Sequence, residues 1–330
     1  MNSLPESNLR DALQALSSQA LVIDLADRAQ LELTGADRAK FLQNLCTNDI
    51  LSLAPGEGCE AFFCNAQGKL VGYAFIFCRP HSLVVESAPH QAAPLFQHLD
   101  RYLIREEVEI HDRSHEWNEI LLAGPQAAAV VQAVVQGDIP TDMLGSSECM
   151  LSNIRLQLRR TPFTIPTNFI LSVARDQTAD LLGVLESHNV SPGTSIAFEA
   201  ARIQAGCPFY GLDISDTNLP QEIDRNTQAI HFQKGCYLGQ ETVARIDALG
   251  HVNQQLVGLS LTSDHQLEPH TAIFSGEKQV GTIKSTATIL DNRLIALGFV
   301  RREHARAGTL LSSPSANGTA DVTVTDLPIA

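Results

Sequence analysis

The chain has 330 residues, more than one hydrophobic core usually serves, so we expect two or three folded domains. Apolar residues make up 44% and charged residues 18% of the sequence, a composition that excludes extensive disorder. The formal net charge of −14 excludes broad electrostatic capture of nucleic acids or anionic membranes, although a few cations gathered in a pocket can still hold an anionic ligand.

The first third of the chain alternates helical and strand patterns. Leu9, Leu13 and Leu16 share one face of a predicted helix, and a second helix is expected to begin near Gly35. Farther along, the apolar runs AFFC and KLVGYAFIFC flank the turn residues NAQG, which predicts a β-hairpin. The predicted strands lie at 21–25, 31–33 and, in the hairpin, within 61–78.

The remaining two thirds continue this mixture and then change character. The patterns predict helices near 91–103, 126–135, 177–188 and 195–205, and strands near 108–110, 119–122, 153–158 and 169–173. Gly206 is expected to close the last of these helices. From about His251 onward, short strands separated by Gly, Asp and Asn turns predict a small antiparallel barrel or sandwich.

One eight-residue segment, Lys234–Glu241 (KGCYLGQE), concentrates the candidate chemistry. Cys236 lies between two glycines, which permit tight turns and close approach of a ligand. If Gln240 begins a helix, its dipole and Lys234 would favour the Cys236 thiolate over a free thiol, whose pKa is about 8.5. The segment therefore predicts an accessible, reactive sulfur, and a small buried thiol is the alternative.

The other cysteines point to packing and to a reducing compartment. The chain has seven cysteines without a CxxC pair, which is typical of reduced thiols in a cytosolic protein. Six of them lie mostly in apolar strands or helix faces, and the role of Cys207 is left open. No histidine stands in a metal-site or triad spacing, so we expect no metal. Residues 1–19 lack a leader pattern, and no apolar run approaches the roughly 18 residues of a membrane helix, so the cytoplasm is expected.

The segment KGCYLGQE, followed by Arg245, resembles the signature of the YgfZ-like, folate-binding branch of the glycine-cleavage T-protein superfamily. The resemblance continues through 31–50, NAQGKL at 65–70, ARIQAGCPFYGLDI at 201–214 and LPQE at 219–222. It covers essentially the whole chain, and the middle portion is the least distinctive.

The resemblance implies an α+β fold, a three-domain ring of the T-protein type that ends in an antiparallel β-barrel. The expected domains are a discontinuous N-terminal domain (1–54 and 148–248), a second domain (55–147) and the barrel (249–330). In relatives, tetrahydrofolate occupies the opening between the domains, so the resemblance also implies tetrahydrofolate or a derivative as the cofactor.

One departure from the family concerns catalysis. Aminomethyltransferases of the superfamily carry an aspartate shortly after the hairpin glycine, which orients the folate nitrogen. Here Gly72 and Tyr73 occupy the aligned positions, and neither can act as a carboxylate acid or base. The resemblance therefore implies a protein without the family's aminomethyl-transfer machinery.

A second departure concerns folate binding. Relatives read R-[LI]-E-A-G, and the resemblance implies that this glutamate meets the pterin, but Gln204 stands in its place here. An amide offers one carbonyl oxygen and no charge, which weakens the expected contact. Gln204 could equally be an ordinary polar residue at a helix edge. The other expected ligand contacts are Arg202, Tyr210, Lys234 and Arg245.

Three functions are compatible with these residues. The first is a folate-binding accessory factor that supports assembly or repair of iron–sulfur clusters, and so iron–sulfur enzymes such as tRNA-modifying ones. Cys236 would be its working thiol, the rest of the signature (Lys234, Gly235, Tyr237, Gly239, Gln240 and Glu241) would shape the site, and its partners would be iron–sulfur assembly or client proteins. The second is a folate-dependent aminomethyl or one-carbon transferase. The third is a scaffold of the same fold that has lost its ligand.

Overall fold

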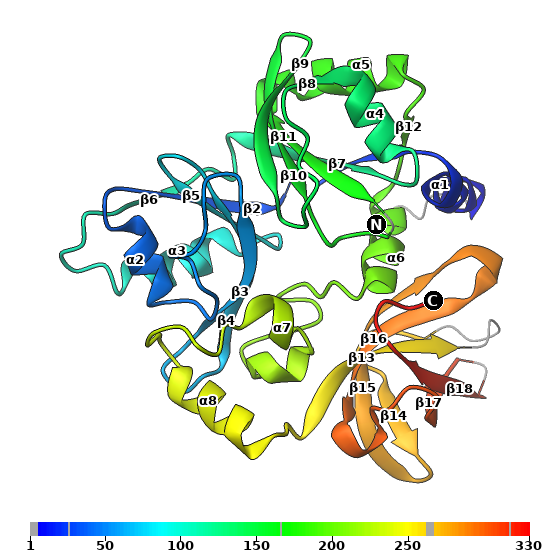
Figure 1. Ribbon diagram of the computed structural model, residues 1–330. Coiled ribbons are helices and arrows are strands. Elements are labelled where there is room, and N and C mark those ends of the chain that lie inside the picture. The colour runs from blue at the N-terminus through cyan, green and yellow to red at the C-terminus, as the bar shows by residue number, and fades with distance from the viewer. Residues whose placement is uncertain (1–5, 26, 166, 262–266, 317) are drawn as a thin grey trace.

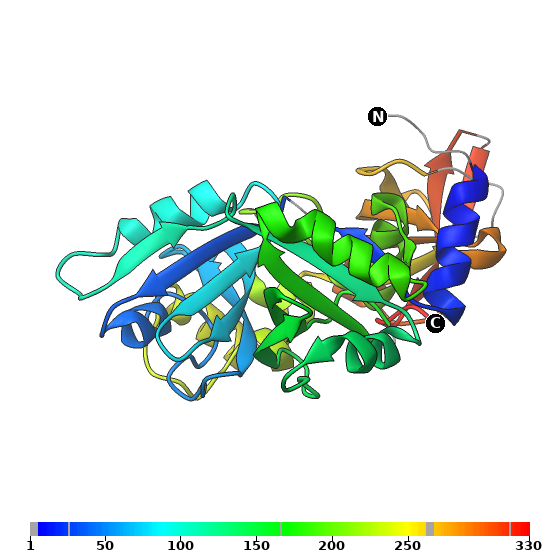
Figure 2. The same cartoon turned by 90° about the horizontal axis from the view of Figure 1, so that it is seen from above.

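A computed structural model describes residues 6–25, 27–165, 167–261, 267–316 and 318–330. Three β-sheet units stand in a ring, and a mostly helical segment that begins with α6 (Ser195–Ala205) and ends with α8 (Gln240–Leu249) leads from the second unit to the third (Figure 1). The N-terminal helix α1 (Glu6–Ser18) packs on α6 and lies beside the third unit (Figure 2). Within the described residues, no helix is both long and apolar enough to cross a membrane.

The first unit is a five-stranded antiparallel sheet in the order β3-β4-β5-β2-β6. Helices α2 (Arg38–Gln43) and α3 (Ala92–Asp100) pack on it through apolar side chains such as Phe41 and Leu95. The strands are β2 (Ala29–Thr34), β3 (Gly58–Cys64), β4 (Leu70–Cys78), β5 (Leu83–Ser87) and β6 (Glu109–Asp112).

The second unit is a seven-stranded sheet in the order β12-β1-β7-β11-β10-β9-β8, in which only the β1–β12 pair is parallel. Val131 of α4 (Ala127–Val134) and Leu181 of α5 (Thr178–Ser187) belong to its apolar core. The strands are β1 (Leu21–Asp24), β7 (Trp117–Ala123), β8 (Val135–Gln136), β9 (Ser146–Leu151), β10 (Ile154–Arg160), β11 (Asn168–Ala174) and β12 (Ser191–Pro192).

The third unit is a closed antiparallel barrel of six strands, which confirms the expected α+β fold with a C-terminal β-barrel. Its strands are β13 (Gln254–Leu261), β14 (Ala272–Ser275), β15 (Lys278–Thr288), β16 (Leu294–Arg301), β17 (Leu310–Ser315) and β18 (Gly318–Thr325). The short helices are α7 (Asn226–Ala229) and the 3₁₀ turns Arg175–Gln177, Pro220–Ile223, Leu290–Asn292 and Arg302–His304.

Most predicted elements form where the residue pattern placed them. Apolar residues at helical spacing give α1, α3, α4, α5 and α6, and the predicted hairpin is β3–β4. Gly206 closes α6 with a φ of +72°, as expected for a left-handed cap.

The sheets divide the chain differently from the expected domain limits. The limit between residues 54 and 55 separates β2 from β3, which belong to one sheet. The limit between 147 and 148 cuts β9 and separates β7 and β8 from the sheet that they share with β10 and β11. This difference has a physical reason: alternation of apolar residues predicts a strand but not the strand with which it pairs.

A single apolar core joins the three units. Phe75 and Phe77 of the five-stranded sheet, Leu121 and Ile170 of the seven-stranded sheet and Phe299 of the barrel belong to one cluster of buried side chains. At the centre of this cluster, Phe75 and Phe163 pack edge to face, with their ring centroids 5.3 Å apart. This shared cluster therefore holds the three units together.

Buried charges link the two open sheets. Glu86 on β5 accepts hydrogen bonds from Arg28, which directly precedes β2, and from Arg159 on β10, whose Nη1 lies 3.0 Å from Glu86 Oε2. The Arg159 Nη1 atom also lies 3.2 Å from Oε1 of Glu119 on β7. These four side chains are almost completely buried, so each charge depends on its partners.

We expect the substitution Glu86→Gln to lower the free energy of unfolding by about 3–5 kcal/mol, because it leaves two buried arginines short of a carboxylate. Urea unfolding followed by circular dichroism measures this change. The matched control is Glu116→Gln, since Glu116 forms an exposed ion pair with Arg113 and should cost less than about 1 kcal/mol. Equal effects of the two substitutions would contradict the role assigned to Glu86.

Candidate functional site

The segment 234–241, called the signature segment below, packs against the turn of the β3–β4 hairpin. Gly239 has a φ of +83°, and a Cβ atom there would lie 2.6 Å from the backbone oxygen of Asn65. A Cβ atom on Gly68, at the opposite side of the contact, would lie 2.6 Å from Thr242 Cβ. Both positions therefore require glycine. The motifs NAQGKL and KGCYLGQE, far apart in the sequence, form one unit.

Lys234 anchors the signature segment to the first unit. Its Nζ atom donates hydrogen bonds to the backbone oxygens of Gln43 (2.7 Å), Cys46 (2.9 Å) and Asn48 (2.5 Å). Burial lowers the pKa of Lys234. An ammonium group has three N–H donors, and all three have acceptors here. The ammonium group of Lys234 therefore holds the backbone that follows α2.

The signature segment has one buried and one exposed side. Lys234, Tyr237 and Gly239 are buried, Gln240 is half-buried, and Gly235, Cys236 and Glu241 are exposed. Gln240 begins α8, as predicted, so Cys236 lies four residues before the first residue of that helix. Nothing lies within 4 Å of a Cβ atom built on Gly235. The backbone beside the thiol is therefore open to an approaching molecule.

Cys236 differs from the other cysteines in its exposure. It is exposed, whereas the other six are buried or half-buried. Burial raises the pKa of Cys46 to about 11 and that of Cys207 to about 12. Cys207, whose role the sequence left open, is therefore a packing residue. Cys236 is the thiol that a partner or reagent can reach.

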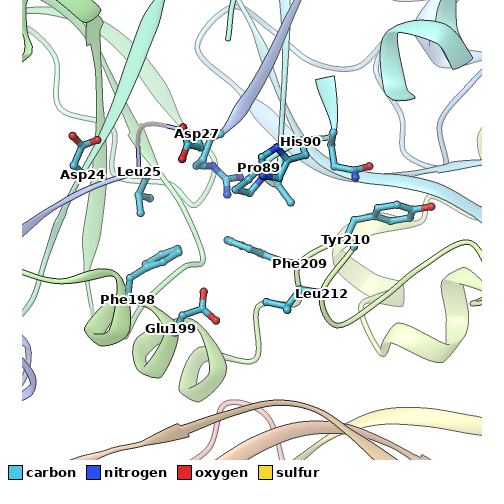
Figure 3. A pocket seen from close by; sticks show the side chains of 14 residues that line it. Asp24, Leu25, Asp27, Pro89, His90, Phe198, Glu199, Phe209, Tyr210 and Leu212 are labelled. Carbon is cyan, nitrogen blue, oxygen red and sulfur yellow. The ribbon is translucent and has the colours of Figure 1, made fainter. Parts of the chain in front are cut away.

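A cavity of about 450 Å³ lies between α6, the loop after β1, the loop after β5 and the segment 209–212. Phe198, Phe209 and Leu212 face Pro89 and His90 across it (Figure 3). The ring centroids of Phe198 and Phe209 lie 5.8 Å apart. The volume falls within the range of small-molecule sites, and aromatic rings provide surfaces on which a flat ligand can stack.

The polar groups at this cavity are mainly hydrogen-bond acceptors. Asp24, Asp27 and Glu199 bring three carboxylates to its lining, and that of Glu199 is paired with Arg202. The guanidinium of Arg28 lies 5.2 Å from the Phe209 ring centroid, and its Nε atom is bound to Glu86. A lining with these groups favours a ligand that offers N–H donors. Among the described residues, no group of three His, Cys, Asp or Glu side chains could hold a metal ion.

Of the five expected folate contacts, Tyr210 alone lines this cavity. Its hydroxyl donates to the backbone oxygen of Leu70 at 3.4 Å, and burial raises its pKa to about 12. Sequence reasoning missed Asp24, Asp27 and Arg28 and the aromatic pair Phe198 and Phe209. The aromatic residues of CPFYG, within a motif already noted, were the one available signal.

Arg202 is a structural residue. Its five N–H groups have acceptors within the protein: the Glu199 carboxylate, the Cys207 backbone oxygen, Asp213 Oδ2 at 2.8 Å and Ser285 Oγ at 3.1 Å. Ser285 lies on β15, so this side chain ties α6 to the barrel. The expectation that Arg202 meets a ligand carboxylate is corrected, because no N–H donor is left for it.

Gln204 and Arg245 also lie outside the cavity. Gln204 lines a separate hollow beside α1 and the barrel, together with Leu13 and Arg293. Its backbone oxygen accepts a hydrogen bond from Ile329 N at 2.8 Å. Arg245 is exposed on α8. The structure therefore does not bring Gln204, Arg202, Lys234 and Arg245 together around one ligand.

The positions that lack the family's aspartate are packed into the core. A Cβ atom on Gly72 would lie 2.5 Å from a methyl group of Leu95. The Tyr73 hydroxyl donates to Glu60 Oε2 at 2.7 Å, and Glu60 is also paired with Arg225. Neither position offers a free carboxylate to a ligand.

Comparisons with known proteins agree on the kind of protein. The sequence model "GCVT N-terminal domain" matches residues 5–234, and "Glycine cleavage T-protein C-terminal barrel domain" matches residues 254–329. The aminomethyltransferase of Rippkaea orientalis is 26% identical over 92% of this chain and 85% of its own length. That of Synechocystis sp. is 26% identical over 92% and 83%. The crystal structure of the glycine cleavage system aminomethyltransferase T from Bartonella henselae has a TM-score of 0.86 at 17% identity, and covers 98% of this chain and 89% of its own.

We expect a maleimide reagent to modify one thiol rapidly in the folded protein, and peptide mass spectrometry should identify it as Cys236, because the other thiols are buried or half-buried. Cys236→Ser should abolish the rapid reaction, whereas Cys78→Ser, a substitution at a half-buried cysteine, should leave it unchanged. Rapid labelling of Cys207 or Cys46 would contradict the assignment.

Proposed function

This chain belongs to the glycine cleavage T-protein family, and we propose that it is a folate-binding accessory factor whose exposed Cys236 supports the assembly or repair of iron–sulfur clusters. The observation that carries the folate part is the aromatic, acceptor-rich cavity between α6 and the loops that follow β1 and β5. The thiol part depends on the exposure of Cys236 outside that cavity.

The chemistry of the cavity suits the pterin ring of a tetrahydrofolate. Phe198, Phe209 and Tyr210 offer flat apolar surfaces, and a pterin is flat and carries N–H donors at one edge. Asp24 and Asp27 offer acceptors for such donors. A charge-assisted hydrogen bond of this kind contributes roughly 1.5–3 kcal/mol. The relatives named aminomethyltransferase support a folate as the ligand class.

The packing at Gly72 and Tyr73 argues against aminomethyl transfer by the family's route. A carboxylate at position 72 would need Leu95 to move, and the Tyr73 hydroxyl is already bound to Glu60. The three carboxylates of the cavity favour a second candidate, a one-carbon transferase that uses one of them. Formation of methylene- or methyl-tetrahydrofolate from a panel of amine donors would favour that candidate, and its absence would favour the accessory role.

The position of Cys236 supports a role toward a partner protein. The thiol does not line the folate cavity, and its segment is anchored on the other side by Lys234. A thiol that faces outward on a fixed segment can ligate a metal ion as a thiolate, or take the outer sulfur of a partner's persulfide while the partner's cysteine returns to a thiol. We propose the cytoplasm as the location and iron–sulfur assembly or client proteins as the partners.

We expect tetrahydrofolate to bind the purified protein in a calorimetric titration, and Leu212→Trp to weaken that binding by about tenfold or more, because the larger ring fills the cavity. Leu249→Trp is the matched control, since Leu249 is also an exposed leucine and does not line the cavity. Gln204→Glu should leave the affinity unchanged. No binding by the native chain would favour the ligand-free scaffold, and a gain with Gln204→Glu would move the site to the other hollow.

We expect Cys236→Ser to fold normally and yet fail to restore iron–sulfur enzyme activity in a strain that lacks the gene, because serine cannot supply a thiolate. Cys78→Ser should restore that activity, and equal protein levels in extracts are the control for stability. Full restoration by Cys236→Ser would refute the proposed role of the thiol.

A further inference from the structure

A second, larger hollow opens between the β3–β4 hairpin and the barrel. This groove has a volume of about 970 Å³ and lies outside the folate cavity. One wall comes from the hairpin and the segment before α7, and the other comes from the connection between α8 and β13 and from the end of β16. Its principal polar residues are Lys69, Thr217, His251, Asn253, Arg301 and Arg302.

The groove carries cationic groups that the protein does not use. Arg301 and Arg302 are exposed, and within the described residues neither side chain has a hydrogen bond or an ion pair. Arg28, Arg159, Arg202 and other arginines, by contrast, are paired with carboxylates. Two adjacent unpaired arginines therefore give this hollow a local positive charge in a chain with a net charge of −14.

The remaining charged groups of the groove leave it net positive. Lys69 Nζ donates one hydrogen bond to the Thr217 backbone oxygen and keeps two N–H donors. Two carboxylates also line the groove, but each has partners: Glu222 accepts from Leu219 N at 3.1 Å, and Glu303 is paired with Lys278. Three cationic side chains therefore face two carboxylates, one of which is paired with Lys278, and the groove is net positive.

The signature segment contacts one wall of this groove and is connected through α8 to the other. At its C-terminal part, Gly239 packs on Gly68, which directly precedes Lys69. Helix α8, which begins at Gln240, ends at Leu249, two residues before His251. The close glycine contact sets the position of the hairpin relative to the barrel connection, so the motif shapes the groove as well as presenting the thiol.

The groove also adjoins the folate cavity. Tyr210 lines the cavity, and its hydroxyl is bound to Leu70 O. Leu70 follows Lys69 of the groove, and its N–H donates to Asn218 O at 3.1 Å. The strand start at 69–70 thus separates the two hollows, and a ligand that extends past Tyr210 would meet the cationic side chains.

We propose that this groove binds a polyanion, a molecule that carries several carboxylate groups along a flexible chain. Arginine guanidinium groups match carboxylates in shape and charge, and the volume of the groove exceeds what a single ion needs. Two sources share this chemistry: an oligo-γ-glutamyl tail on the folate in the adjacent cavity, or a separate polycarboxylate. The first source rests on the proposed function, and the second does not.

The test is calorimetry on the full chain with three probes: monoglutamyl tetrahydrofolate, pentaglutamyl tetrahydrofolate and penta-γ-glutamate peptide. The variant is Arg301→Gln/Arg302→Gln, and the control is Arg306→Gln, an exposed arginine that does not line the groove. We expect the native chain to bind the peptide, and the double variant to weaken that binding by about tenfold, as loss of two exposed ion pairs implies. Binding should also weaken as salt rises from 50 to 200 mM.

The outcomes separate the two proposals. If the pentaglutamyl folate binds more tightly than the monoglutamyl form, and the double variant removes that difference alone, the tail of the folate occupies the groove. If neither folate binds but the peptide does, and the double variant loses the peptide, the groove stands and the folate proposal fails. The groove proposal is overturned if the peptide does not bind, or if the double variant binds it as well as Arg306→Gln does.

Discussion

The pairing of two buried arginines with two buried glutamates, across the face where the open sheets meet, is the constraint on which the rest of the ring depends. Arg28 and Arg159 reach Glu86 from different sheets, and Arg159 also reaches Glu119. Removing any one partner leaves an uncompensated charge in the interior, so the four side chains act as a unit. The same arginine, Arg28, also lines the aromatic cavity, so the ion cluster fixes one wall of the candidate site.

The barrel is joined to the ring by similar chemistry. All N–H groups of Arg202 donate hydrogen bonds to Glu199, Asp213, Ser285 and a backbone oxygen. Those of Lys234 donate to backbone oxygens in and after the end of α2. These cations connect elements instead of meeting ligands. Two arginines that have no ion pair within the described part of the chain, Arg301 and Arg302, lie in the groove between hairpin and barrel. The division explains how a chain with an excess of acidic residues can still offer a local anion site.

Local sequence predicted most of the helices and strands. Apolar periodicity placed α6 and its Gly206 cap, and turn residues placed the β3–β4 hairpin. It could not predict which sheet each strand joins, because β1 and β2 are neighbours in the chain and pair in different sheets. Nor could it tell that Arg202 and Lys234 are buried, because their partners lie on other elements, up to 191 residues away for Lys234. Residue type predicted a cation, and only packing decided its use.

The proposed position of a folate ring is among Phe198, Phe209 and Tyr210, away from Cys236. A crystal structure of the protein grown with tetrahydrofolate would locate the ring directly. We expect density for a pterin in that aromatic cavity, with its N–H edge toward Asp24 or Asp27 and with the Cys236 thiol unmodified. Density for the pterin beside Gln204, or against Cys236, would contradict it.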